Sequence, residues 1–278
     1  MTAVLLALVC AVAYGVADFW GGLATRRASV LKVLPVIVIS GIVMLLCFLP
    51  FLGADFSPAA VRAGLFAGFA GVFGYALVMY SLALGPMSVV APITAVTASI
   101  IPFTVGIVRG DRLSLASSIG ALIALISIVL VSRTTADATH PITRKAVIAS
   151  LLAGVSVSGY LLGISGGPAD SGIAPVLVAR CVTGILFTLA ALTQLKRLGT
   201  EQPNYKLAIA SGSLDVWGGT GFMLATRHGA LAMVSVISAL YPALTVLLAR
   251  VVLHERLERH QVIGLGGAGL AVVLLTLG

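Results

Sequence analysis

The stretch MVSVISALYPALTVLLARVVLHERLE, residues 233–258, decides how the chain is read. It holds an apolar run with an internal proline, Pro242, followed by the charged segment His254-Glu255-Arg256. A second apolar run, residues 262–277, follows at once. Two apolar runs separated by a short charged segment are typical of two membrane-spanning helices joined by a tight loop.

The same plan occurs earlier in the chain, at residues 89–114. The two stretches align without a gap at an offset of 144 residues. The alignment pairs Gly85 with Gly229, Thr94 with Ser238, Thr97 with Tyr241, Asp111 with Glu255, Arg112 with Arg256 and Gly120 with Gly264. The sequence therefore predicts an internal duplication, and a duplication of membrane spans is typical of transporters built from repeats.

Composition excludes a water-soluble domain. Of the 278 residues, 59% are hydrophobic and 9% charged, with a mean hydropathy of +1.14, whereas soluble domains carry about a quarter charged residues. The N-terminal run, residues 2–24, lacks a charged segment before it and carries Asp18 and Trp20 late. We interpret it as a first membrane span rather than a cleaved signal peptide.

Charged and Gly/Pro-rich breaks divide the chain into ten apolar spans, and the longest polar stretch, residues 133–145, leaves five on each side. Because five is odd, the second copy must enter the membrane with the opposite orientation. We predict an all-α integral membrane protein of ten transmembrane helices, arranged as two inverted five-helix repeats around a central cavity. The first repeat covers residues 1–133, the linker 134–145 and the second repeat 146–278.

The net charge of +8 is spread over short loops, so we expect no nucleic-acid partner. Twelve of the 17 Lys and Arg residues fall on one side: Arg26, Arg27, Lys32, Arg133, Arg144, Lys145, Lys196, Arg197, Lys206, Arg250, Arg256 and Arg259. The other side receives Arg62, Arg109, Arg112 and Arg227. The positive-inside rule places the first side in the cytoplasm and both termini outside.

Three ionisable residues lie within spans: Asp18, Arg180 and Asp215. A charge at the middle of a membrane helix costs about 2.5–3.5 kcal/mol on insertion scales, so each is a candidate functional residue. Three interpretations stay open. Arg180 and Asp215 form an internal ion pair, or these residues contact the substrate or a proton, or their side chains reach the membrane interface.

Polar and aromatic residues recur at helical spacing on several spans. Tyr14 is one turn before Asp18, and Ser235, Ser238 and Tyr241 share one face of the ninth span. A single Ser or Thr more often bonds its own helix backbone, but the set, repeated in both halves, favours a mildly polar cavity with aromatic walls. The predicted substrate-binding residues are Tyr14, Asp18, Tyr75, Thr94, Thr97, Tyr160, Arg180, Asp215, Ser235, Ser238 and Tyr241.

Prolines interrupt corresponding spans of the two halves. Pro92 and Pro102 lie in the fourth span and Pro242 in the ninth. Each removes a backbone hydrogen bond and kinks its helix. We predict that they are the hinges of a conformational change.

The segment YPALTVLLARVVLHERLE, residues 241–258, with the ten spans and two repeats, resembles the drug/metabolite transporter superfamily, specifically its EamA-type ten-helix members. The first repeat departs from this pattern, with Ala98 in the place of Pro242 and Asp111 in that of Glu255. The chain looks most like the YddG-type exporters of aromatic and other neutral amino acids. The resemblance implies a ten-helix basket in the bacterial inner membrane, no cofactor, and export of small metabolites.

We therefore expect a secondary transporter that exports small metabolites, aromatic or neutral amino acids first, by alternating access. Its partners are the substrate and the lipid bilayer, and no oligomer is required. A passive channel is one alternative. An integral-membrane enzyme is another, but the sequence lacks paired metal-ligand and nucleophile motifs, and the three cysteines, all in apolar runs, lack metal-site spacing. We predict no enzyme activity and no metal site.

Overall fold

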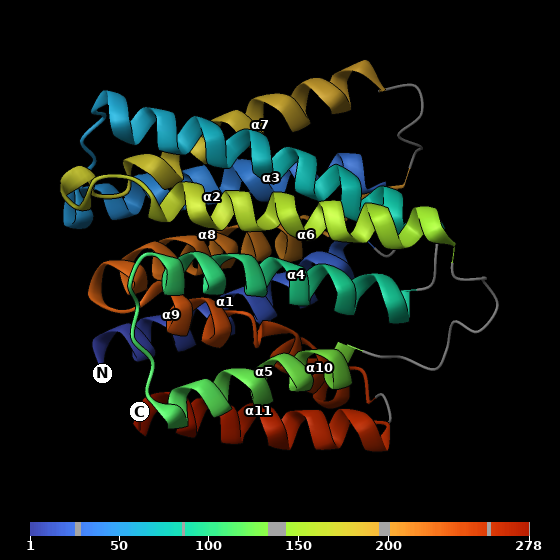
Figure 1. Ribbon diagram of the computed structural model, residues 1–278. Coiled ribbons are helices and arrows are strands. Elements are labelled where there is room, and N and C mark those ends of the chain that lie inside the picture. The colour runs from blue at the N-terminus through green and yellow to red at the C-terminus, as the bar shows by residue number, and fades with distance from the viewer. Residues whose placement is uncertain (26–28, 85–86, 133–142, 195–200, 255–256, 278) are drawn as a thin grey trace.

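The computed structural model describes residues 1–25, 29–84, 87–132, 143–194, 201–254 and 257–277. The described regular structure is helical, and the helices run roughly parallel between two ends of the molecule (Figure 1). The first half contains α1 (Thr2–Thr25), α2 (Val30–Leu52), α3 (Pro58–Leu84), α4 (Met87–Val108) and α5 (Leu115–Ser132). The second contains α6 (Arg144–Ser165), a 3-10 turn at Ala169–Ser171, α7 (Ala174–Thr193), α8 (Tyr205–His228), α9 (Leu231–Ser238), α10 (Tyr241–Val252) and α11 (Arg259–Leu277).

By length and composition, nine segments of the described chain can cross a membrane: α1 to α7, α9 with α10, and α11. The exception, α8, has 24 residues and so is about 36 Å long, enough for a bilayer. Its composition is more polar because it carries Ser211, Asp215 and several glycines. It lies along α1 and α2 within the bundle. The predicted fold class, ten membrane helices in two inverted repeats, is confirmed.

Side chains cap the N-termini of several helices at the ends of the bundle. Thr143 Oγ1 accepts a hydrogen bond from the Ala146 amide at 3.1 Å, at the start of α6. Asn204 Oδ1 accepts one from the Leu207 amide at 3.3 Å, at the start of α8. Capping satisfies amides that have no partner within the helix, so polar residues mark the places where the chain turns back. The predicted linker 134–145 lies mostly outside the described residues, as do Glu255 and Arg256, and the limits of the repeats stay a prediction.

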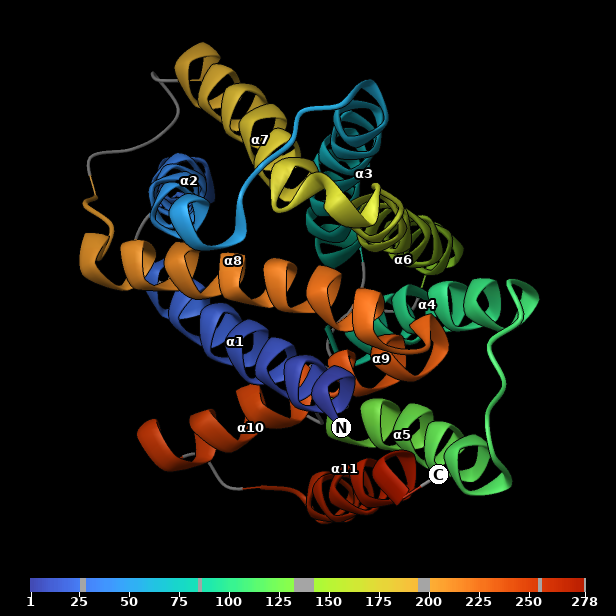
Figure 2. The ribbon, with the colours of Figure 1, turned by 90° about the vertical axis from the view of Figure 1, so that its left-hand side faces the viewer.

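Helix pairing follows the exchange of the two halves. The most extensive contacts are those of α1 with α8, α3 with α6 and α5 with α11. If each helix is replaced by its counterpart in the other half, the α1–α8 pair becomes the α6–α3 pair, and the α5–α11 pair becomes itself. Figure 2 shows α5 beside α11 at one edge of the bundle and α3 near α6 and α7 at the opposite edge.

Small residues form many of the buried helix contacts, and many large apolar side chains face outward. The buried residues of α1 include Ala3, Ala7 and Cys10, while its Leu5 and Val9 are exposed. On α3, a Cβ at Gly64 would lie 2.6 Å from the Cβ of Val178. Lipid provides no hydrophobic drive between helices, so close approach of small faces must hold the bundle together.

The ninth span is broken in its middle. α9 ends at Ser238 and α10 begins at Tyr241, with Pro242 in the first turn of α10. Proline is tolerated there because the amide it lacks would have no helical partner. α4, by contrast, includes Pro92 and Pro102 within one helix. The hinge function of these prolines stays a prediction.

Candidate functional site

The candidate site is a pocket of about 610 Å³ between the two halves. Helices of both halves line it: α1 to α4 from the first, and α6 to α10 from the second. It reaches the end of the bundle at which α1 finishes and α2 begins, where Gly22, Thr25 and Val30 line it. We call this the open end and the opposite end, where both termini lie (Figure 1), the N/C end.

An ion pair stands in the pocket wall. Arg180 Nη2 on α7 contacts Asp215 Oδ2 on α8, and their side chains are 11% and 24% exposed. The same Nη2 lies 3.4 Å from the Tyr160 hydroxyl, and the guanidinium carbon lies 5.9 Å from the centre of the Tyr160 ring. Of the three interpretations that the sequence left open, the structure shows the internal ion pair between Arg180 and Asp215. Pairing neutralises two charges that would each be costly alone at membrane depth.

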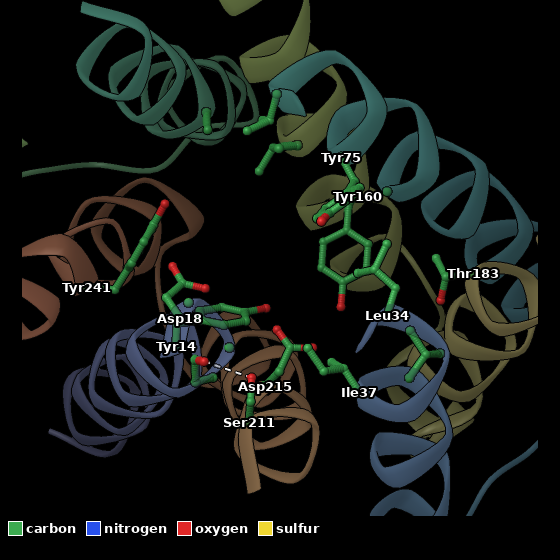
Figure 3. A pocket seen from close by; sticks show the side chains of 18 of the residues that line it. Tyr14, Asp18, Leu34, Ile37, Tyr75, Tyr160, Thr183, Ser211, Asp215 and Tyr241 are labelled. Atoms are coloured by element: carbon green, nitrogen blue, oxygen red, sulfur yellow. Dashed lines mark hydrogen bonds between the residues drawn. The ribbon is translucent and has the colours of Figure 1, made fainter. Parts of the chain in front are cut away.

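Aromatic rings form two groups around the pocket. Tyr14 of α1 meets Tyr241 of α10 edge-to-face, with ring centres 6.2 Å apart. Tyr75 of α3 meets Phe187 of α7 in the same way at 5.4 Å. Figure 3 shows Tyr14 and Tyr241 on one side of the central space, and Tyr75 and Tyr160 on the other. A flat apolar group of a ligand can therefore be held between aromatic faces.

Asp18 is exposed although it lies within α1, because its side chain faces the pocket. Figure 3 shows Asp18 beside Tyr14, with Tyr241 on one side and Asp215 on the other. Its helix is fixed against α8 by Ser211, whose hydroxyl donates to the carbonyl of Ala17 at 2.7 Å. Asp18 is thus held on a tightly packed helix pair, with its carboxylate toward the space where a ligand fits.

Comparison with known protein families shows to which family the chain belongs. The sequence model of the EamA-like transporter family matches residues 1–133 and 144–277.

The chain belongs to the EamA-like transporter family.

This EamA-like transporter is therefore a multi-pass membrane protein that moves small molecules, and members of its family are transporters rather than enzymes. Its fold also matches a solved crystal structure of a protein, with a TM-score of 0.75 over 99% of this chain and 98% of the other. The two sequences are 18% identical, so this likeness shows the fold alone. A comparison with curated proteins finds no match.

Nine of the predicted substrate-binding residues line the pocket of this EamA-like transporter: Tyr14, Asp18, Tyr75, Tyr160, Arg180, Asp215, Ser235, Ser238 and Tyr241. Thr94 and Thr97 do not, which corrects their predicted place in the cavity wall. Thr94 Oγ1 bonds the Ser150 carbonyl at 3.3 Å and Thr97 Oγ1 the Ile93 carbonyl at 2.8 Å. Both pack against Gly154, where a Cβ would lie 2.5 Å from the Cβ of Thr97. This face of α4 is used for packing on α6.

Several lining residues were not predicted. Thr183 and Phe187 follow Arg180 by three and seven residues, so they share its face of α7. Ser211 precedes Asp215 by one turn. Helical spacing from the charged residues would have found all three. The described residues contain no group of three or more His, Cys, Asp or Glu placed to hold a metal ion.

Proposed function

We propose that this EamA-like transporter exports small amphipathic metabolites, aromatic and neutral amino acids first, by alternating access of the pocket to the two sides of the membrane. The observation that carries the proposal is a pocket that is lined by both halves and reaches the open end, while side-chain hydrogen bonds join segments of the chain at the N/C end. In transporters with inverted repeats, the substrate site lies at the repeat interface, and one repeat moves against the other around it.

The cover at the N/C end supports this mechanism. Arg227, at the end of α8, donates from Nη2 to the Pro168 carbonyl at 3.2 Å, the Ser171 hydroxyl at 3.2 Å and the Gly172 carbonyl at 3.0 Å. The segment that it binds pairs with the α2–α3 loop, because the Ile173 amide donates to the Gly53 carbonyl at 2.9 Å. Alternating access requires these polar contacts to open.

A second contact at the same end joins the two halves. Asp111 Oδ2, after α4, accepts a hydrogen bond from the Ala232 amide at 2.9 Å, in the first turn of α9. The amides at a helix start have no intrahelical acceptor, and the helix dipole favours a carboxylate there. Asp111 therefore joins the two halves directly, whereas Arg227 joins two segments of the second half at the same end.

The pocket suits an amino acid with a large side chain. Tyr14, Tyr241, Tyr75 and Phe187 provide the aromatic faces, while Asp18 and the paired Arg180 and Asp215 provide the charged groups. Small-molecule sites commonly combine apolar walls with a few placed polar groups.

The orientation of the protein in the membrane follows from the positive-inside rule. With the arginine-rich loops in the cytoplasm of a bacterial inner membrane, the open end faces inward and both termini face outward. A reporter enzyme that is active only outside the cell, fused to the C-terminus, tests this orientation.

The test of function is uptake of labelled phenylalanine, tryptophan and alanine into proteoliposomes, with and without the same compound preloaded. Alternating access predicts saturable uptake that preloading accelerates. A channel, the alternative mechanism, takes up the compound without such acceleration. Absence of uptake for every amino acid tested would contradict the amino-acid assignment.

A further inference from the structure

The charges that line the pocket do not balance. The charged lining residues are Asp18, Arg180 and Asp215. Arg180 and Asp215 are paired with each other. Among the residues that the structure describes, none forms an ion pair or a hydrogen bond with the Asp18 carboxylate. The pocket lining therefore presents one acidic group, Asp18, whose charge no described residue balances.

A carboxylate at membrane depth is stabilised by a positive partner. Asp18 lies seven residues before the end of α1, about 10 Å along the helix axis. Away from bulk water, an unpaired carboxylate is unfavourable, so intramembrane acids normally face a pathway and pair with a cation. Because the described chain supplies no cation to Asp18, the occupant of the pocket is the natural source.

The surroundings of Asp18 favour an organic ammonium group over a metal ion. Ions such as Ca²⁺ and Mg²⁺ require several oxygen ligands at once, and the described residues contain no group of three or more His, Cys, Asp or Glu that could hold one. Asp18 lies instead beside the Tyr14 and Tyr241 rings (Figure 3), whose centres are 6.2 Å apart. Tyrosine faces attract alkylammonium groups, and a carboxylate beside them adds a charged hydrogen bond.

A substrate carboxylate finds no equivalent partner. The only charged donor in the described lining is Arg180, which already contacts Asp215 and the Tyr160 hydroxyl. The Arg180 Nε has no hydrogen-bond partner among the described residues, so a substrate carboxylate can accept from it without displacing Asp215, but the charge of the guanidinium is already balanced by Asp215. An ammonium group at Asp18 meets a carboxylate whose charge no described residue balances.

We propose that Asp18 binds the ammonium group of the substrate, and that this positive charge, rather than a carboxylate, is what the pocket requires. The proposal rests on the transport function above and makes it specific. Arylalkylamines are then substrates at least as good as the corresponding amino acids. Acids of the same shape without an amine are not bound.

The experiment uses three probes of one shape with the purified full-length protein: phenylalanine, phenethylamine, which lacks the carboxylate, and 3-phenylpropionate, which lacks the amine. Binding is measured by the shift in thermal unfolding in detergent, and transport by uptake into proteoliposomes. The variants are Asp18→Asn, Asp18→Glu and, as a control, Glu201→Gln, which removes the same charge from an exposed residue before α8.

We expect phenethylamine to bind and be transported at least as well as phenylalanine, and 3-phenylpropionate to do neither. Asp18→Asn should raise the half-saturating concentration of phenethylamine by about tenfold or more, the effect of losing a desolvated charged hydrogen bond. Asp18→Glu should restore part of the affinity, and Glu201→Gln should match the wild type. The three probes on the wild type keep the test decisive even if Asp18→Asn does not fold.

The outcomes separate this proposal from the transport function. Transport of phenylalanine and binding of 3-phenylpropionate, without binding of phenethylamine, would overturn the assignment of Asp18 and leave the amino-acid carrier intact. Transport of phenethylamine alone would support Asp18 and remove amino acids as substrates. If none of the three probes binds, the assignment of Asp18 is wrong and phenylalanine is not a substrate, and uptake of tryptophan and alanine then decides the amino-acid assignment separately.

Discussion

The Arg180–Asp215 pair illustrates how a membrane protein tolerates charge. Each residue alone is costly within a span, and each is compensated here by the other. The pair also joins α7 to α8, and through the Tyr160 hydroxyl it reaches α6. One charged contact therefore fixes three helices of the second half around the pocket.

Breaking this pair should destabilise the protein. Asp215→Asn leaves the Arg180 guanidinium without its counter-charge, and we expect a loss of about 3–5 kcal/mol, as for other buried pairs from which one partner is removed. The double variant Arg180→Gln, Asp215→Asn removes both charges and should recover most of that loss. Thermal unfolding in detergent, followed by intrinsic fluorescence, measures both. Equal losses in the single and double variants would show that charge pairing is not the stabilising interaction.

At the scale of elements, the glycines of α8 position the pocket residues of its neighbours. A Cβ at Gly218 would lie 2.6 Å from Cδ1 of Tyr14, so the ring rests directly on the α8 backbone. A Cβ at Gly219 would lie 2.9 Å from the Tyr160 hydroxyl and 3.4 Å from that of Tyr14. Two tyrosines from opposite halves thus meet over one glycine pair.

Gly218→Ala should therefore disturb the site as well as the fold. Either the Tyr14 ring moves into the pocket or α1 and α8 separate, and overpacking of this kind costs about 1–3 kcal/mol. We expect a lower unfolding temperature and weaker binding of phenylalanine. Gly266→Ala in α11 is the matched control, because nothing lies within 4 Å of a Cβ there and alanine favours the helix. If the two variants behave alike, the close contact of Tyr14 with α8 is unimportant.

At the scale of the whole molecule, the two ends of the pocket are closed to different degrees. The backbone at the N/C end is built for close contact: Gly172 has a φ of +56°, a region that favours glycine. A Cβ there would lie 2.1 Å from the Gly53 carbonyl oxygen. The Arg227 side chain then joins α8 to this segment. Alternating access requires these contacts to separate while others form at the open end.

Arg227→Gln should shift the protein toward a state that is open at the N/C end. With Cys10, Cys47 and Cys181 replaced by alanine, Ser238→Cys provides a thiol at the deep end of the pocket. A membrane-impermeant thiol reagent is then applied from the N/C side. We expect it to label this cysteine several-fold faster when Arg227→Gln is present than when Arg227 is kept. Arg62→Gln, at an exposed arginine near the same end, is the control. Unchanged labelling would mean that Arg227 does not hold the closure.

The sequence by itself determined the membrane class, the ten spans and the inverted duplication. These depend on the length of apolar runs, on an odd number of spans per repeat and on residue pairs such as Gly120 and Gly264, all of which are local or additive along the chain. It also placed Tyr14 and Asp18, and Ser235, Ser238 and Tyr241, on common helix faces, because helical spacing fixes which residues of one helix point the same way.

Only the tertiary structure decided which faces meet. It paired Arg180 with Asp215, turned Thr94 and Thr97 onto α6 and left Asp18 facing the pocket without a cation among the described residues. It also decided that Arg227 binds the segment 168–172 at the N/C end. The physical reason is that the rotation and tilt of each helix are set by packing against helices distant in sequence, so periodicity within one span cannot specify its neighbour.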